Sequence, residues 1–199
     1  MSSTQIQWFC KHLQVRNYAQ HTIENYALDL RLFFEAVDKR LKEISWRDVD
    51  DFVHQQHGQD LAPTTINRRL YAIKRFFDFL VVEQEQLPIN PVKPSHYLRQ
   101  GKPLPKKLTQ EQIKRLFWQI KNLMDHTLFL LMLRCGLRVS EVARLKVSDI
   151  DWEQKSLFIE QGKGRKDRIV YLSQDAFGSL KECFKRRPAS MAEDYFFWN

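Results

Sequence analysis

The chain has 199 residues, of which 43% are hydrophobic and 28% are charged, and its formal net charge is +8. This size allows one large domain or two small ones with real cores. Three scattered cysteines (Cys10, Cys135 and Cys183) lack disulfide or zinc-ligand spacing, so buried thiols are expected and no metal site is indicated. The N-terminus has no signal-peptide pattern, and no stretch approaches the roughly 18 uncharged residues of a membrane span. We expect a cytoplasmic protein that contacts no membrane.

The positive charge is concentrated in the middle of the chain. Residues 101–150 carry ten Lys and Arg against four Asp and Glu. Such a local excess is typical of a protein that binds a polyanion, above all nucleic acid. An ordinary solvated basic face is the alternative interpretation of the charge alone.

Residues 1–87 have the pattern of a helical domain. Apolar side chains between residues 23 and 37 recur at offsets of 3, 4 and 7, which is the one-sided stripe of an amphipathic helix. We expect four helices, at about residues 4–16, 20–38, 45–57 and 64–85.

A proline-rich linker is predicted to follow this domain. Residues 88–107 hold five of the seven prolines, show no sustained periodicity and end on the basic residues Lys106 and Lys107. We place both lysines among the DNA-binding candidates. Residues 108–199 then form the second domain.

The fourth predicted helix carries a basic face. Its core side, set by Ile66, Leu70 and Ile73, leaves several polar side chains on the other side, with Arg69 at the core edge. No acid interrupts the run from residue 64 to residue 75, so this face suits phosphates and base edges in a major groove. A solvated basic face is again the alternative. The candidates on this helix are Thr64, Asn67, Arg68, Lys74 and Arg75.

The second domain begins with a capping-box pattern, Thr109 followed three residues later by Gln112, which predicts a helix from Gln110. The apolar run "HTLFLLMLRCGL" predicts a central buried helix ending near Gly136, and a short helix through residue 145 follows. The runs "SLFIEQ" and "RIVYL" flank the turn "GKGRKD" and predict a β-hairpin, after which the chain returns to helix.

The order "GLRVSEVARL", "SDID" and "GKGRKDRIVYL" resembles the first half of the catalytic domain of tyrosine site-specific recombinases, the family of the Xer proteins and phage integrases. The segments "YAQHTIENYALDLRLFFEAV" and "TTINRRLYAIKRFFDFL" resemble that family's helical core-binding domain. The resemblance implies a mainly α fold: a four-helix SAM-like core-binding domain, then part of an α+β catalytic domain with a small β-hairpin or sheet.

The resemblance also implies a chemistry, in which a tyrosine attacks a DNA phosphodiester and forms a 3′-phosphotyrosyl link without an external energy source or cofactor. Arg138 matches the family's first catalytic arginine, whose permanent charge and forked donors suit a phosphorane. Lys163 matches the turn lysine that protonates the leaving 5′-oxygen. Glu141 is expected to orient this region, although Arg138 and Glu141 could also simply form a surface ion pair. Around the predicted turn, the residues expected to contact the DNA backbone are Arg165, Lys166 and Arg168.

The family's catalytic set continues with a His-x-x-Arg motif and a tyrosine nucleophile, which this sequence lacks; its last histidine is His126. We therefore expect a recombinase cut off within its catalytic domain, with Tyr195 not acting as nucleophile and the aromatic residues 195–198 left exposed. The expected partners are duplex DNA and other recombinase protomers. One alternative is a noncatalytic DNA-binding protein that occupies recombination sites or antagonises a full-length enzyme. Another is a helical scaffold without affinity for DNA.

Overall fold

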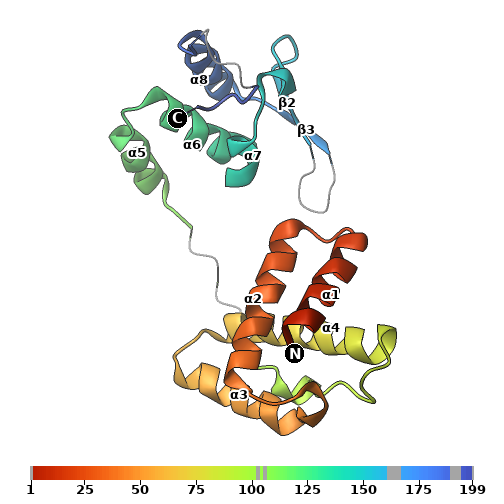
Figure 1. Cartoon of the computed structure of the whole chain (residues 1–199). Coiled ribbons are helices and arrows are strands. Elements are labelled where there is room, and N and C mark those ends of the chain that lie inside the picture. Colours follow the sequence, from red (N-terminus) through yellow and green to blue (C-terminus); the bar gives the residue numbers. More distant parts are fainter. Residues whose placement is uncertain (1, 102–103, 105–106, 161–166, 189–193, 199) are drawn as a thin grey trace. The chain divides into compact units, whose positions relative to one another are not determined.

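The chain forms two compact units, Met1–Leu104 and Pro105–Asn199, in a computed structural model (Figure 1). The structure describes residues 2–101, 104, 107–160, 167–188 and 194–198. Each unit has its own hydrophobic core, around which its secondary-structure elements pack.

The first unit is helical throughout its described residues, and α2 packs against both α1 and α4 while α3 covers α4 (Figure 1). Its elements are α1 Ser2–Val15, α2 Gln20–Ala36, the 3-10 turn η1 Leu41–Glu43, α3 Trp46–Gly58, α4 Pro63–Asp78, the π-helical turn η2 Phe79–Glu83 and the 3-10 turn η3 Pro94–His96. The four predicted helices are confirmed. The fourth is shorter than expected because the α-helix passes into the π-helical turn at Phe79.

Local sequence signals account for these helices. The apolar stripe of α2 buries Ile23, Leu30 and Phe33 in the core. Helix α3 begins after Ser45, whose backbone N–H donates to Asp48 at 2.8 Å in a capping box. Helix α4 begins with Pro63, whose fixed φ and missing N–H suit the first helical turn.

Residues 88–98 differ from the linker expected there, because they pack against the first unit. Val92 is buried in its core. The Asn67 side chain donates to the Leu98 carbonyl and accepts from the Leu98 N–H, both at 2.8 Å. Asn90 donates to Asp78 at 2.7 Å. Proline content alone predicted a linker, but these hydrogen bonds and apolar contacts tie the segment to α4.

The second unit combines helices with a small antiparallel sheet of order β1-β2-β3, and α6 packs against α8 (Figure 1). Its elements are α5 Gln110–Gln119, α6 Leu123–Cys135, α7 Val139–Ala143, the 3-10 turn η4 Val147–Asp149, β1 Ile150–Asp151, β2 Ser156–Ile159, β3 Arg168–Tyr171 and α8 Gln174–Lys185. In the register, Ile150 lies opposite Leu157, and Leu157 lies opposite Val170. The predicted hairpin is confirmed, and the short strand β1 extends it to three strands.

The predicted helix boundaries of this unit rest on two observed caps. The Thr109 hydroxyl accepts from the Gln112 N–H at 3.2 Å, and the helix begins at Gln110 as expected. Gly136 ends α6 at a φ of 63°, a left-handed conformation that glycine adopts without steric cost. Helix α6 is less buried than predicted, because Phe129 and Leu133 on one face remain 41% and 45% exposed.

The expectation that the C-terminal aromatic residues 195–198 are left exposed is wrong for Phe196 and right for Tyr195. Phe196 is fully buried, and its N–H donates to the Leu145 carbonyl at 2.7 Å. Tyr195 pairs with Lys146 in an antiparallel bridge and stays 42% exposed. Phe196 therefore belongs to the core of the second unit, and Phe197 and Trp198 pack against that core. Among the described residues, none of the helices is long and apolar enough to cross a membrane.

Candidate functional site

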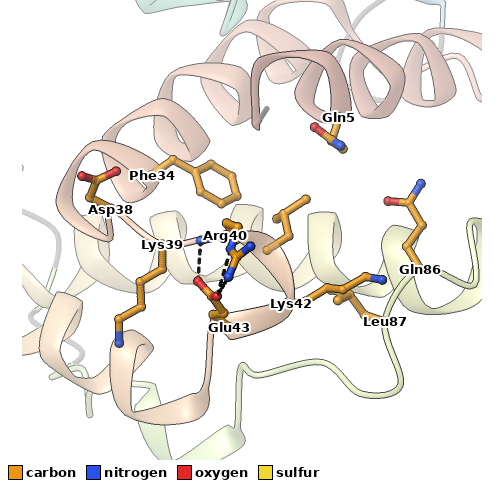
Figure 2. Close-up of a pocket in the computed structure, with 10 residues that line it drawn as sticks. Gln5, Phe34, Asp38, Lys39, Arg40, Lys42, Glu43, Gln86 and Leu87 are labelled. Atoms are coloured by element: carbon orange, nitrogen blue, oxygen red, sulfur yellow. Dashed lines mark hydrogen bonds and ion pairs between the residues drawn. The ribbon is translucent and has the colours of Figure 1, made fainter.

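A hollow of about 690 Å³ opens on the first unit between the end of α2 and the turn η1 (Figure 2). Two of the cations that line it are already paired: Arg40 donates to Glu43, and Lys39 donates to the buried Asp48. The hydrogen bond from Lys39 is the main reason that the pKa of Asp48 falls to about 2. The charges of Lys39 and Arg40 are thus engaged within the first unit.

A role of the basic residues of α4 in DNA binding stays a prediction, and Arg68 among them is exposed but is already paired within the first unit. Its guanidinium binds both oxygens of Asp29 on α2, with Nη2 at 2.9 Å from Oδ1, and the Asp29 side chain is only 1% exposed. Burial raises the pKa of Asp29, and the hydrogen bonds from Arg68 oppose that rise. Arg69, next along the helix, donates to Gln56 on α3. These two arginines therefore join α4 to α2 and α3.

Three of the other candidates on α4 are also engaged within the unit. Asn67 is hydrogen-bonded to Leu98 through both its amide nitrogen and its amide oxygen, as described above. Lys74 donates to Asp78 at 2.7 Å, and Arg75 donates to the Tyr18 hydroxyl at 2.6 Å. Thr64 is exposed in the first turn of α4. Helical projection placed these residues relative to the α4 core face, but it could not reveal partners on other segments.

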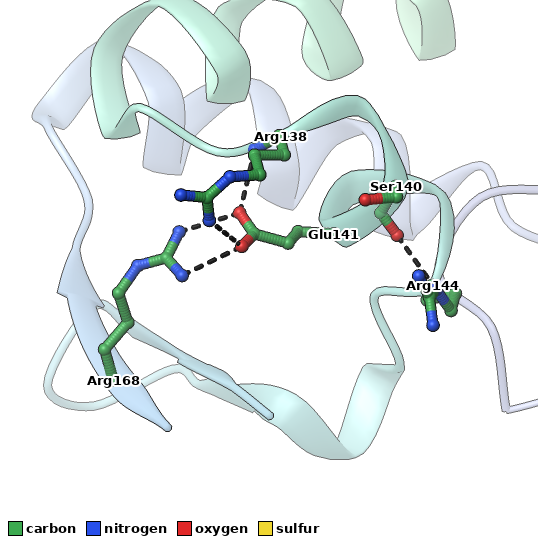
Figure 3. Close-up of polar contacts among 5 residues, drawn as sticks. All are labelled: Arg138, Ser140, Glu141, Arg144 and Arg168. Carbon is green, nitrogen blue, oxygen red and sulfur yellow. Dashed lines mark hydrogen bonds and ion pairs between the residues drawn. The ribbon is translucent and has the colours of Figure 1, made fainter. Parts of the chain in front are cut away.

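Arg138 and Glu141 come together at the start of α7 in the second unit (Figure 3). The Glu141 carboxylate accepts from the Arg138 N–H at 2.8 Å and from its Nη1 at 2.6 Å. The i,i+3 spacing places both groups on one turn, which is why the sequence suggested this pair. The Glu141 side chain is 8% exposed, whereas that of Arg138 is 50% exposed. Glu141 therefore orients an arginine whose guanidinium still reaches solvent.

Arg168 on β3 binds the same carboxylate, which its spacing of 27 residues from Glu141 gave no reason to predict (Figure 3). Its Nη1 lies 2.9 Å from Glu141 Oε1, and its Nη2 lies 2.7 Å from Oε2. Both outer nitrogens of the Arg168 fork are thus engaged by Glu141, and a contact between Arg168 and the DNA backbone stays a prediction. Arg168 ties the start of β3, opposite the end of β2, to α7.

The two arginines make Glu141 unusually acidic. The hydrogen bonds from Arg168 are the largest cause of a fall in the Glu141 pKa to about 2; burial opposes it, and the hydrogen bonds from Arg138 add to it. A carboxyl group whose pKa is depressed on folding stabilises the folded state above its unfolded pKa of about 4.3. This contribution is lost as the pH falls through about 2.

We predict that Glu141→Gln removes this pH-dependent contribution to the stability of the second unit. The variant should unfold more easily than the wild type at pH 6, by up to about 3 kcal/mol, and the difference should shrink between pH 4.5 and pH 2. Urea unfolding followed by circular dichroism at several pH values measures it. A destabilisation that is equal at pH 6 and pH 2.5 would contradict the assignment.

The remaining sequence candidates lie partly beyond the described residues. Lys163, Arg165 and Lys166 fall in residues 161–166, and Lys106 falls in residues 105–106, so all four lie outside the described part of the chain. Lys107 is described and is exposed. Among the described residues, β2 ends at Ile159 and β3 begins at Arg168.

Two family models match the chain in the places that the structure separates. The model for the N-terminal SAM-like domain of phage integrases matches residues 6–84, and the phage integrase family model matches residues 106–199. The chain belongs to the phage integrase family of tyrosine recombinases. The predicted fold class is thereby confirmed, with a SAM-like helical domain preceding an integrase domain that holds a small sheet.

Similar curated proteins carry the same family name. A tyrosine recombinase from Thermosipho africanus is 30% identical over 186 residues, which cover 89% of this chain and 65% of the relative. The tyrosine recombinase XerA of Pyrococcus horikoshii is 30% identical over 189 residues, covering 94% of this chain and 62% of the relative. The chain thus spans somewhat less than two thirds of the length of these integrase-family relatives.

Solved integrases share the fold at low sequence identity. A lambda integrase dimer bound to a COC' core site superposes with a TM-score of 0.75 at 17% identity, covering 91% of this chain and 66% of that one. A Tn1549 transposon integrase in complex with transposon right end DNA gives a TM-score of 0.73 at 16% identity, covering 98% of this chain and 71% of that one. These likenesses support the fold of this integrase-family chain.

Proposed function

We propose that this chain binds duplex DNA and contributes Arg138 and Lys163 to a tyrosine recombinase centre. The observation that carries the proposal is the arrangement of Arg138, whose guanidinium is oriented by the largely covered side chain of Glu141 and whose own side chain is half exposed. A forked, permanently charged donor held in this way suits the nonbridging oxygens of a phosphodiester. With this role we propose a cytoplasmic location for the chain, together with other recombinase protomers on the same DNA.

In this proposal the two residues act on charge that develops during transesterification. A tyrosine oxygen attacks the phosphorus, the bond from phosphorus to the 5′-oxygen breaks, and the 5′-oxygen takes a proton from Lys163. Arg138 stabilises the negative charge on the nonbridging oxygens of the phosphorane. The reaction needs no cofactor. The nucleophile and the His-x-x-Arg residues come from outside the 199 residues of this chain, which have no histidine after His126.

The absence of a His-x-x-Arg motif after the predicted hairpin favours a second function for a polypeptide of these 199 residues alone. Such a polypeptide would bind recombination sites without cutting them and would compete with a longer recombinase. The two functions share DNA binding and differ in whether a covalent protein–DNA complex forms.

We predict that the chain binds duplex DNA with a steep dependence on salt. The proposed contacts to several phosphates, among them Arg138, Lys163, Arg165 and Lys166, release counterions, so affinity should fall by orders of magnitude between about 50 and 200 mM salt. Fluorescence anisotropy with a labelled duplex measures the slope. The absence of binding at low salt would contradict both functions and would favour a helical scaffold, whereas binding indifferent to salt would contradict phosphate contacts.

A further inference from the structure

The ion-pair cluster of the second unit contains two arginines and one carboxylate, and the two arginines are held differently. Arg168 engages both oxygens of Glu141 through two nitrogens, at 2.9 and 2.7 Å. Arg138 uses one side-chain nitrogen, Nη1, and its backbone N–H. The Arg138 side chain is 50% exposed and that of Arg168 is 34% exposed. The Arg168 guanidinium thus makes more hydrogen bonds to the carboxylate than the Arg138 guanidinium does.

This difference decides which arginine can leave the carboxylate. A buried charge without a counter-ion is strongly unfavourable, so Glu141, at 8% exposure, needs at least one cation at all times. If Arg138 turned toward another anion, the fork of Arg168 and the Arg138 N–H would still bind Glu141. If Arg168 were absent, Arg138 would be the cation left beside Glu141 among the described residues, and its guanidinium would be held on the carboxylate.

We infer that Arg168 is a positioning residue that acts as the standing counter-ion of Glu141 and thereby frees the guanidinium of Arg138 to bind a phosphate. The inference rests on the proposed function, because it takes a DNA phosphate as the anion that Arg138 binds. It gives Arg168 a role in phosphate binding that needs no contact between Arg168 and the DNA. The backbone N–H of Arg138 keeps its hydrogen bond to Glu141, so the start of α7 stays in place while the side chain moves.

The test is a double-mutant cycle on DNA binding by the 199-residue chain. Arg138→Ala is measured in three backgrounds: wild type, Arg168→Gln, and the double variant Glu141→Gln with Arg168→Gln. In the wild type we expect Arg138→Ala to weaken binding about fivefold and to lower the slope of log K against log salt by about 1. In the Arg168→Gln background the same change should alter affinity less than about twofold, because Arg138 is already held by Glu141.

The third background separates this role from a merely structural one. Neutralising the carboxylate with Glu141→Gln should release Arg138, so the effect of Arg138→Ala should return to about fivefold. A further variant, Arg168→Lys, keeps a positive charge at this position. It allows the inference to be tested even if the Arg168→Gln chain does not fold. With lysine at this position, Arg138→Ala should retain most of its wild-type effect. Circular dichroism checks that each variant is folded.

The possible outcomes separate a failure of the proposed role of Arg168 from a failure of the proposed DNA binding. An equal effect of Arg138→Ala with and without Arg168 would overturn the inference while leaving DNA binding intact. A loss in the Arg168→Gln background that Glu141→Gln does not restore would also overturn it, because Arg168 would then act only on the fold. A wild-type chain that fails to bind DNA at low salt would refute the proposed function, and the inference would fall with it.

Discussion

Replacing Arg138 with alanine should slow DNA cleavage by at least about 100-fold in a chimaera that carries this chain followed by the C-terminal part of a related tyrosine recombinase. The expected loss is large because the arginine acts on charge that grows in the transition state, where one lost donor costs about 10² or more in rate. Lys163→Ala should have a similar effect, since it removes the proposed general acid. A nicked suicide substrate, from which the cleaved fragment diffuses away, traps the covalent complex for measurement.

Two controls accompany this experiment. Lys181→Ala removes an exposed lysine on α8 and should leave the cleavage rate unchanged. The 199-residue chain without the added segment should give no covalent band, because the residues proposed here stabilise the phosphorane and leaving group but do not attack phosphorus. A band from the unextended chain would make Tyr195 the first residue to mutate. Wild-type cleavage after Lys163→Ala would show that the general acid is another group.

Arg68→Ala should destabilise the first unit by about 3 kcal/mol, because it leaves the buried Asp29 carboxylate without its main hydrogen-bonded partner. Arg69 is the nearest remaining cation, and its Nε lies 3.9 Å from Asp29, too far for a good hydrogen bond. The free energy of unfolding in urea, followed by circular dichroism, measures the loss. Because Arg68 ties α2 to α4, we expect Arg68→Ala to reduce DNA binding only by reducing the fraction of folded protein.

A matched surface pair provides the control. Arg115 and Glu111 form an i,i+4 ion pair on α5 with side chains 78% and 75% exposed, so Arg115→Ala should cost less than about 0.5 kcal/mol. If Arg68→Ala were as mild as Arg115→Ala, the buried pair would not stabilise the unit. If Arg68→Ala kept full stability but lost preference for particular DNA sequences, the original prediction of base contacts would be correct.

Much of the fold was predictable from local patterns. Periodic apolar residues predicted the helices of the first unit, because a helix buries one face and repeats every 3.6 residues. Thr109 and Gly136 marked helix ends, since a hydroxyl cap and a left-handed glycine act within a few residues. The glycine-containing turn predicted the hairpin. The motifs around Arg138 and Lys163 indicated the family, which the family models confirm.

What the sequence by itself determined are features that depend on neighbours along the chain: the helices, their caps, the hairpin and the Arg138–Glu141 pair. Only the tertiary structure decided which cations are engaged, because their partners lie far away in sequence. Arg68 meets Asp29 across 39 residues, and Arg168 meets Glu141 across 27. The same holds for Asn67 with Leu98 and for the burial of Phe196. Helical projection gives the direction of a side chain, but the burial of a distant carboxylate decides whether that side chain stabilises the fold or stays available to a ligand.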